Sequence, residues 1–212
     1  DKVRLKNVLD LGVMAFIQDW MRDDPGLVSR LAVMSAPDLI VGAGWTVAPL
    51  YFGFVGVPDR DELKEVDFIG EYGDFWSRMA KLLARSRGVR DPVAEYRGAV
   101  RRQVGFVANN TGVLLEDLGR RDEAYQVYKQ VRAIDIENIS ALLNMAEILN
   151  RDPAFMPEDK PLVEKELKDF VDNMARRLPV WSLSRYFGYV RSPVLFAQLG
   201  WTWALSGQPG MA

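Results

Sequence analysis

Two glycines, Gly112 and Gly119, place the strongest constraint on how this chain can fold. The stretch before Gly119 has helical spacing, and a glycine just past the last apolar residue of a helix can take a positive φ without a Cβ clash. Ala124 and Tyr128 follow at helical spacing and share one face. Because Gly112 and Ala124 are both small, two helix backbones can approach closely at this point while larger side chains interlock around them. The sequence therefore predicts two helices joined by a tight turn over residues 105–138.

The chain has 212 residues and contains neither cysteine nor histidine. This composition excludes disulfides, thiolate metal sites and cysteine nucleophiles, and it removes the commonest general base and metal ligand. A net charge of −2 is unlike that of a dedicated nucleic-acid binder. We therefore expect no enzymatic activity, no cofactor, no metal and no nucleic-acid partner. The composition leaves the compartment open between cytoplasmic and periplasmic.

Residues 1–70 are predicted to form a small α/β element. A helix is expected over 1–21, followed by short strands over 31–35 and 49–57. The uncharged span 39–57 is long enough to suggest a transmembrane helix, but its glycines and a proline break it into short pieces. We therefore expect no membrane insertion of this chain.

From residue 71 to residue 212 the sequence reads as helical. Asp74 and Asn138 have the positions of N-caps, and Pro92 stands at a typical first helical position. A helix from Pro92 to Leu118 is unusually long, and a break near Gly105 is the alternative. Besides the second helix of the hairpin, which carries Ala124, Tyr128 and Val131, helices are expected over 74–87, 92–118, 139–150, 161–177, 181–190 and 193–205.

Small residues recur in register along this helical part. Counted from Gly105 as the first position, small residues stand at the eighth, fifteenth and twentieth positions. A second copy counted from Pro193 has small residues at the same three positions, and a weaker copy begins at Ile139. The matching sets are Gly112, Gly119 and Ala124 in the first copy and Gly200, Gly207 and Ala212 in the last.

This pattern resembles the tetratricopeptide repeat (TPR), a helix–turn–helix unit of about 34 residues. The sequence departs from the family at Ala108, where the repeat often has tryptophan, and at Ile136, where it often has proline. The resemblance implies a mainly α fold, with a short TPR-like α-solenoid over 71–212 preceded by the small α/β element. The last copy stops at its twentieth position, so we expect the parent protein to continue. An unrelated bundle of helical hairpins is the alternative.

In TPR proteins the first helix of each unit lines a concave, ligand-binding surface. Asn110 and Asn144 share the sixth position, where an asparagine can bond the backbone of an extended peptide through both its donor and its acceptor. Contact with a neighbouring helix is the alternative role for these positions. Carried over to this sequence, the implied binding residues are Phe106, Asn109, Asn110, Val113, Glu116, Asp117, Leu143, Asn144, Glu147, Arg151, Ala197 and Trp201.

The resemblance implies a protein–protein interaction scaffold that binds a peptide, a partner protein or its own N-terminal element through the concave surface. The lysines and arginines with which some relatives hold a peptide carboxylate are absent at these positions, so capture of a C-terminus is not expected. The alternative is the soluble C-terminal region of a larger bacterial membrane protein, glycosyltransferase-like, with no activity of its own. Many apolar segments encoded upstream would favour that alternative.

Overall fold

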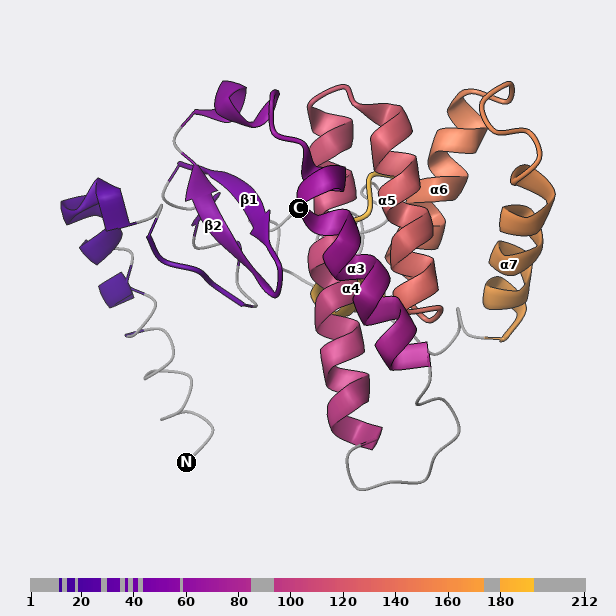
Figure 1. The fold of residues 1–212 in the computed structure, drawn as a ribbon, viewed down its shortest axis with the longest axis horizontal. Coiled ribbons are helices and arrows are strands. Elements are labelled where there is room, and N and C mark those ends of the chain that lie inside the picture. Colours follow the sequence, from indigo (N-terminus) through magenta and orange to yellow (C-terminus); the bar gives the residue numbers. More distant parts are fainter. Residues whose placement is uncertain are drawn as a thin grey trace, which may run out of the picture. The chain divides into compact units, whose positions relative to one another are not determined.

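The computed structural model describes residues 12, 15–17, 19–27, 30–34, 37, 40–41, 44–57, 59–84, 94–173 and 180–192. The chain divides into two compact units, Asp1–Asp67 and Phe68–Ala212 (Figure 1).

The first unit is built around a β-hairpin. Its described residues between 12 and 23 are helical, and a 3-10 turn, η1 (Pro25–Leu27), follows. Strands β1 (Thr46–Leu50) and β2 (Gly53–Val57) pair antiparallel and are joined through a tight turn in which Tyr51 has a φ of 44°. The single strand predicted over 49–57 is therefore wrong, because the chain reverses inside that apolar run.

Within the described residues, a third segment forms an isolated β-bridge with the hairpin. Val33 and Phe54 exchange both backbone hydrogen bonds, at N···O distances of 2.8 and 2.7 Å, so the strand predicted over 31–35 reduces to a single bridge. The backbone N–H and C=O of Phe54 both point to Val33, on one side of β2. On the other side Phe54 lies opposite Pro49 of β1 in a non-hydrogen-bonded pair, so the missing N–H of the proline costs no ladder bond. Glycine is required at residue 53, since a Cβ there would lie 2.6 Å from the carbonyl oxygen of Val33. A short 3-10 helix, η2 (Arg60–Leu63), ends the unit, and the side chain of Asp59 caps it.

The second unit begins with helix α3 (Phe68–Ala84), which starts ahead of the cap predicted at Asp74. Phe68, Tyr72 and Trp76 form a stripe with ring centroids 6.2 and 5.9 Å apart, and Trp76 is 1% exposed. The helix packs against the second helix of the predicted hairpin. Burial of this aromatic stripe stabilises the first turns of α3, which lack a strong local start signal.

The predicted hairpin is confirmed, as α4 (Ala94–Asp117) and α5 (Arg121–Ile134). Gly119 has a φ of 79°, and its N–H and that of Arg120 donate to the carbonyls of Glu116 and Leu115, which is a Schellman motif. Helix α4 passes Gly105 without a break, so the alternative of two shorter helices is wrong. A Cβ on Gly105 would lie 3.2 Å from the Cβ of Asp135, which follows α5.

Helices α6 (Ile139–Arg151), α7 (Lys160–Asn173) and α8 (Val180–Phe187) complete the described part of this unit. Asn138 caps α6 as predicted, since its side chain accepts the N–H of Ala141 at 3.0 Å. Neighbours in sequence from α4 to α7 lie side by side (Figure 1), and α8 contacts both α4 and α6. Helix α8 ends before Gly188 and not at residue 190. The helix predicted over 193–205 lies outside the described residues.

The chain is thus mainly helical with one small two-stranded antiparallel sheet, which confirms the predicted fold class. Among the helices that the structure describes, none is both long enough and apolar enough to cross a membrane.

Candidate functional site

Four buried asparagines gather where α4, α6 and the turn between α5 and α6 meet. Asn109 and Asn110 lie on α4, Asn138 caps α6, and Asn144 lies six residues further along, within α6. Their exposed fractions are 0% for three of them and 8% for Asn110. Because a buried amide must find hydrogen-bond partners to offset its loss of water, such a cluster needs an explanation. We refer to Asn109, Asn110, Asn138 and Asn144 as the asparagine cluster.

The asparagine cluster bonds to main-chain groups of a distant part of the same chain, in addition to the cap at Ala141 and to bonds among the amides themselves. Nδ2 of Asn144 donates to Oδ1 of Asn109 at 3.3 Å, and Nδ2 of Asn109 donates to Oδ1 of Asn110 at 3.5 Å. The distant part, residues 187–191 (Phe-Gly-Tyr-Val-Arg), begins at the last residue of α8 and continues beyond it. Tyr189 donates its N–H to Oδ1 of Asn110 at 2.8 Å, and its carbonyl accepts from Nδ2 of Asn109 at 2.9 Å. The Phe187 carbonyl accepts from Nδ2 of Asn138 at 3.1 Å. We refer to these five residues as the docked segment.

Asn144 uses both ends of its amide on the docked segment. Its Nδ2 donates to the carbonyl of Tyr189 at 3.0 Å, and its Oδ1 accepts the N–H of Arg191 at 2.8 Å. The C=O of one residue and the N–H of the second residue after it point the same way in extended backbone, which is how one strand presents itself to the next. The side chain of Asn144 therefore takes the place of a neighbouring strand.

Gly188 lets the docked segment approach this closely. It is buried and has a φ of 93°, a region that side chains other than glycine rarely adopt. A Cβ at this position would lie 2.5 Å from Nδ2 of Asn109 and 2.7 Å from Oδ1 of Asn110. Any larger residue would therefore both strain the backbone and displace the two amides that hold Tyr189.

Charged groups hold the far end of the docked segment. The guanidinium of Arg191 forms an ion pair with the carboxylate of Asp117, at the C-terminal end of α4. Arg151, near the C-terminus of α6, donates from Nη2 to the carbonyl of Arg191 at 3.4 Å and pairs with Glu147 at 2.9 Å. The side chains of Arg191 and Asp117 are 32% and 41% exposed, so water screens their attraction.

Glu116 lies between this charged end and the hairpin core. It accepts a hydrogen bond from the hydroxyl of Tyr128 at 2.7 Å. Burial raises the pKa of Glu116, and this effect outweighs the Tyr128 hydrogen bond and the nearby guanidinium of Arg191, which lower it. Burial also raises the pKa of Tyr128, and the charge of Glu116 raises it further, so the phenol stays protonated.

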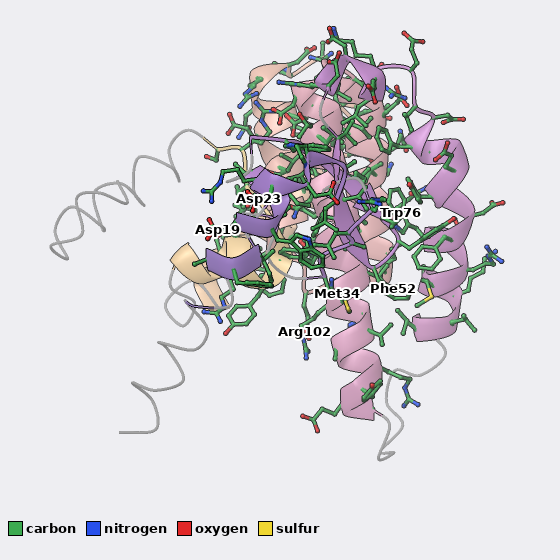
Figure 2. All side chains as sticks on the ribbon, turned by 90° about the vertical axis from the view of Figure 1, so that its left-hand side faces the viewer. Asp19, Asp23, Met34, Phe52, Trp76 and Arg102 are labelled. Atoms are coloured by element: carbon green, nitrogen blue, oxygen red, sulfur yellow. The ribbon has the colours of Figure 1, made fainter. Side chains whose placement is uncertain are left out.

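A second buried carboxylate, Asp135, braces the opposite end of α4. It is fully buried, and one of its oxygens lies 3.2 Å from Nε of Arg101. Burial raises the pKa of Asp135 more than Arg101 lowers it. Arg101 also lies 3.6 Å from a carboxylate oxygen of Glu137, whereas the next residue, Arg102, is exposed (Figure 2), with its guanidinium beside Gly98 of the same helix. These contacts tie α4 to the turn that carries Asn138.

The structure brings five of the predicted binding residues together on the docked segment: Asn109, Asn110, Asp117, Asn144 and Arg151. The other predicted binding residues on α4 and α6 lie outside this group of five. Phe106 is buried, and Val113, Glu116, Leu143 and Glu147 are half-buried. The last two, Ala197 and Trp201, lie outside the described residues.

Sequence reasoning missed Asn138 as a contact, because its role as a cap already explained it. It also missed Gly188 and Arg191, the residues that fit the docked segment to the asparagine cluster. The signal available in the sequence was a glycine followed closely by an arginine, directly after a short aromatic helix. That pattern is common enough in loops to carry little information by itself.

The described residues include no group of three or more acidic side chains arranged to hold a metal ion. The contacts observed between the asparagine cluster, Asp117 and the docked segment are hydrogen bonds to backbone groups and the ion pair with Arg191. No protein-family model, no curated protein and no solved structure matches this chain.

Proposed function

We propose that residues 68–212 act as a protein-interaction scaffold that binds an extended peptide segment of a partner on the TPR-like surface formed by α4 and α6. The observation that carries this proposal is a set of four hydrogen bonds: Asn109 and Asn144 donate to the carbonyl of Tyr189, and the N–H groups of Tyr189 and Arg191 donate to Asn110 and Asn144 respectively. Bonds to main-chain groups do not depend on the bound sequence, so the same amides can hold a segment from another chain.

Burial of the asparagine cluster supports a binding role over ordinary helix packing. Helix–helix contacts are normally made by apolar side chains, and an amide in such a contact costs free energy unless it is satisfied. The cluster places its hydrogen-bonding groups toward a segment without regular structure. In addition, Nδ2 of Asn110 is buried and has no hydrogen-bond partner in the structure, so one donor remains for another acceptor.

The docked segment is a built-in competitor in this proposal. The sequence suggested the N-terminal element as one possible occupant, beside a peptide or a partner protein, and in the structure residues 187–191 contact the asparagine cluster. A partner must therefore displace this segment, which weakens the partner's apparent affinity. The weakening grows with the effective concentration of the tethered segment, which is in the millimolar range for short flexible tethers.

The test supplies the segment in trans to a protein whose own copy cannot dock. A Gly188→Val substitution introduces the Cβ clash and a strained φ at that position. The probe is a peptide of residues 185–192 with an amidated C-terminus and a fluorescent label on its N-terminus, titrated by fluorescence anisotropy. Gly44→Val is the matched control, because Gly44 also has a positive φ of 79° but has open space around it.

We expect the peptide to bind the Gly188→Val protein, to bind the wild type and the control much more weakly, and to lose binding when Asn144→Ala is added. Circular dichroism and thermal unfolding establish that each variant is folded. If Gly188→Val does not fold, Arg191→Pro removes the N–H that Asn144 accepts and frees the site in another way. Absence of peptide binding by a folded variant with a displaced segment would contradict the proposed function.

A further inference from the structure

The asparagine cluster holds the backbone of any extended segment, but two positions of the docked segment depend on the side chain. These positions are occupied by Gly188 and Arg191. They are separated by two residues, so together they define a pattern that a partner segment can match or fail to match.

The first selective position admits only glycine. The two amide groups that a Cβ would strike belong to Asn109 and Asn110, which lie in one turn of α4 and are 0% and 8% exposed. Both are hydrogen-bonded to Tyr189, the next residue of the docked segment. They cannot move aside without breaking those bonds, so the restriction is steric and does not depend on salt.

The second selective position favours a guanidinium. Asp117 pairs with Arg191, and Glu116 next to it lies close enough for the charge of Arg191 to lower its pKa. The backbone of Arg191 is held at the same time, by Asn144 at its N–H and by Arg151 at its carbonyl. A planar guanidinium is suited to a carboxylate through paired N–H donors, and a residue of opposite charge would be repelled here.

We propose that the asparagine cluster, with Asp117, selects extended segments of the pattern Gly-x-x-Arg, so that its partner is a protein displaying such a basic segment in place of this chain's own residues 188–191. This inference rests on the proposed function and specifies the ligand of the same site. The glycine position selects by shape, because a side chain would clash there. The arginine position selects by charge. The two contributions to binding affinity can therefore be measured separately.

The test measures the binding of peptide variants to the Gly188→Val protein. Three changes are made in the peptide of residues 185–192: alanine at the glycine, glutamate at the arginine that matches Arg191, and alanine at the arginine that matches Arg185. The last is the matched control, because Arg185 is an exposed residue of α8 and its replacement also removes one positive charge. A fourth peptide with alanine at the Arg191 position gives the size of the ion pair.

The glycine-to-alanine change is expected to weaken binding by at least about tenfold at any salt concentration, since strain and clash act together. Removing the Arg191 guanidinium should weaken binding by about twofold to fivefold, because the pair is partly exposed. That loss should shrink as salt rises. Reversal to glutamate should weaken it further, and Asp117→Arg in the protein should restore binding of the glutamate peptide. The Arg185 control should bind like the parent peptide.

Equal binding of all four altered peptides and the parent would overturn this inference while leaving the proposed function intact. Equal loss on replacing either arginine would also overturn it, because attraction would then depend only on net charge. Failure of every peptide, parent included, would instead contradict the proposed function.

Discussion

Replacing Gly112 by alanine tests the close approach on which the α4–α5 hairpin depends. A Cβ at Gly112 would lie 2.3 Å from Cε1 of Tyr128 and 2.8 Å from both Cδ1 and Cζ. Carbon atoms pack at about 3.5–4.0 Å, so the ring must retreat by more than about 1 Å. The ring is fully buried, and its hydroxyl is bonded to Glu116 at 2.7 Å, so a shift that relieves the clash strains this bond.

Two effects of opposite sign decide the outcome. Overpacking a dense core costs about 1–3 kcal/mol, and weakening the Tyr128 hydrogen bond adds about 1 kcal/mol. Alanine returns about 1 kcal/mol through its higher helix propensity. We therefore expect Gly112→Ala to lower the free energy of unfolding by about 1–3 kcal/mol, which lowers Tm by about 2–4 °C for each kcal/mol in a chain of this size.

The same helix supplies the control. The nearest atom to a Cβ at Gly98 is Nη1 of Arg102, at 3.5 Å and at the end of a flexible side chain. Gly98→Ala should therefore raise stability by up to about 1 kcal/mol, as helix propensity alone predicts. Urea unfolding followed by circular dichroism measures both variants. A Gly112→Ala protein as stable as the wild type would refute the packing argument, as would a cost that persists undiminished in a Tyr128→Leu background.

Three further predictions concern single residues. The pKa of Glu116 is raised in the folded state, so this carboxyl binds a proton more tightly there than in the unfolded chain. The free energy of unfolding should therefore fall as pH rises above about 4.5. Urea titrations at several pH values measure this slope, which Glu116→Gln should flatten. Asn138→Ala should lower stability by about 1–2 kcal/mol, whereas Asn138→Ser should keep an oxygen that can cap α6 and lose the amide donor to Phe187, so chemical denaturation should place it between wild type and alanine. Gly53→Ala should open the bridge to Val33, because its Cβ meets that carbonyl at 2.6 Å, and the amide of the following residue should then exchange its hydrogen much faster.

Local signals in the sequence predicted local structure well. The Gly119 turn and the Asn138 cap are each specified within four residues, because a positive φ or a side-chain cap depends only on near neighbours. The start of α3 was misplaced because burial of Phe68 and its neighbours outweighs the cap signal at Asp74. The β-hairpin was read as one strand because its turn, at Tyr51, lacks the usual turn residues.

The candidate site was only partly accessible to sequence reasoning. For Asn110 and Asn144 the sequence left open contact with an extended backbone or with a neighbouring helix. Both amides contact the backbone of the docked segment, and Asn144 also donates to Asn109 on α4, so both kinds of contact are present. The sequence could not indicate which backbone, because the contact joins residues about eighty positions apart and no local pattern encodes such a pairing. The fit of Gly188 to α4 becomes visible only once both partners are placed.

The separation of the docked segment from α4 along the chain also has a consequence for the order of folding. The α4–α5 hairpin needs only a short turn to close, whereas bringing Tyr189 to Asn109 closes a loop of 80 residues. The entropy lost in closing a loop grows with its length, so these contacts form after the hairpins that create the asparagine cluster. Mutations in the docked segment should therefore speed unfolding and leave the rate of folding almost unchanged. The segment completes the native structure last, which suits a part of the chain that another molecule can replace.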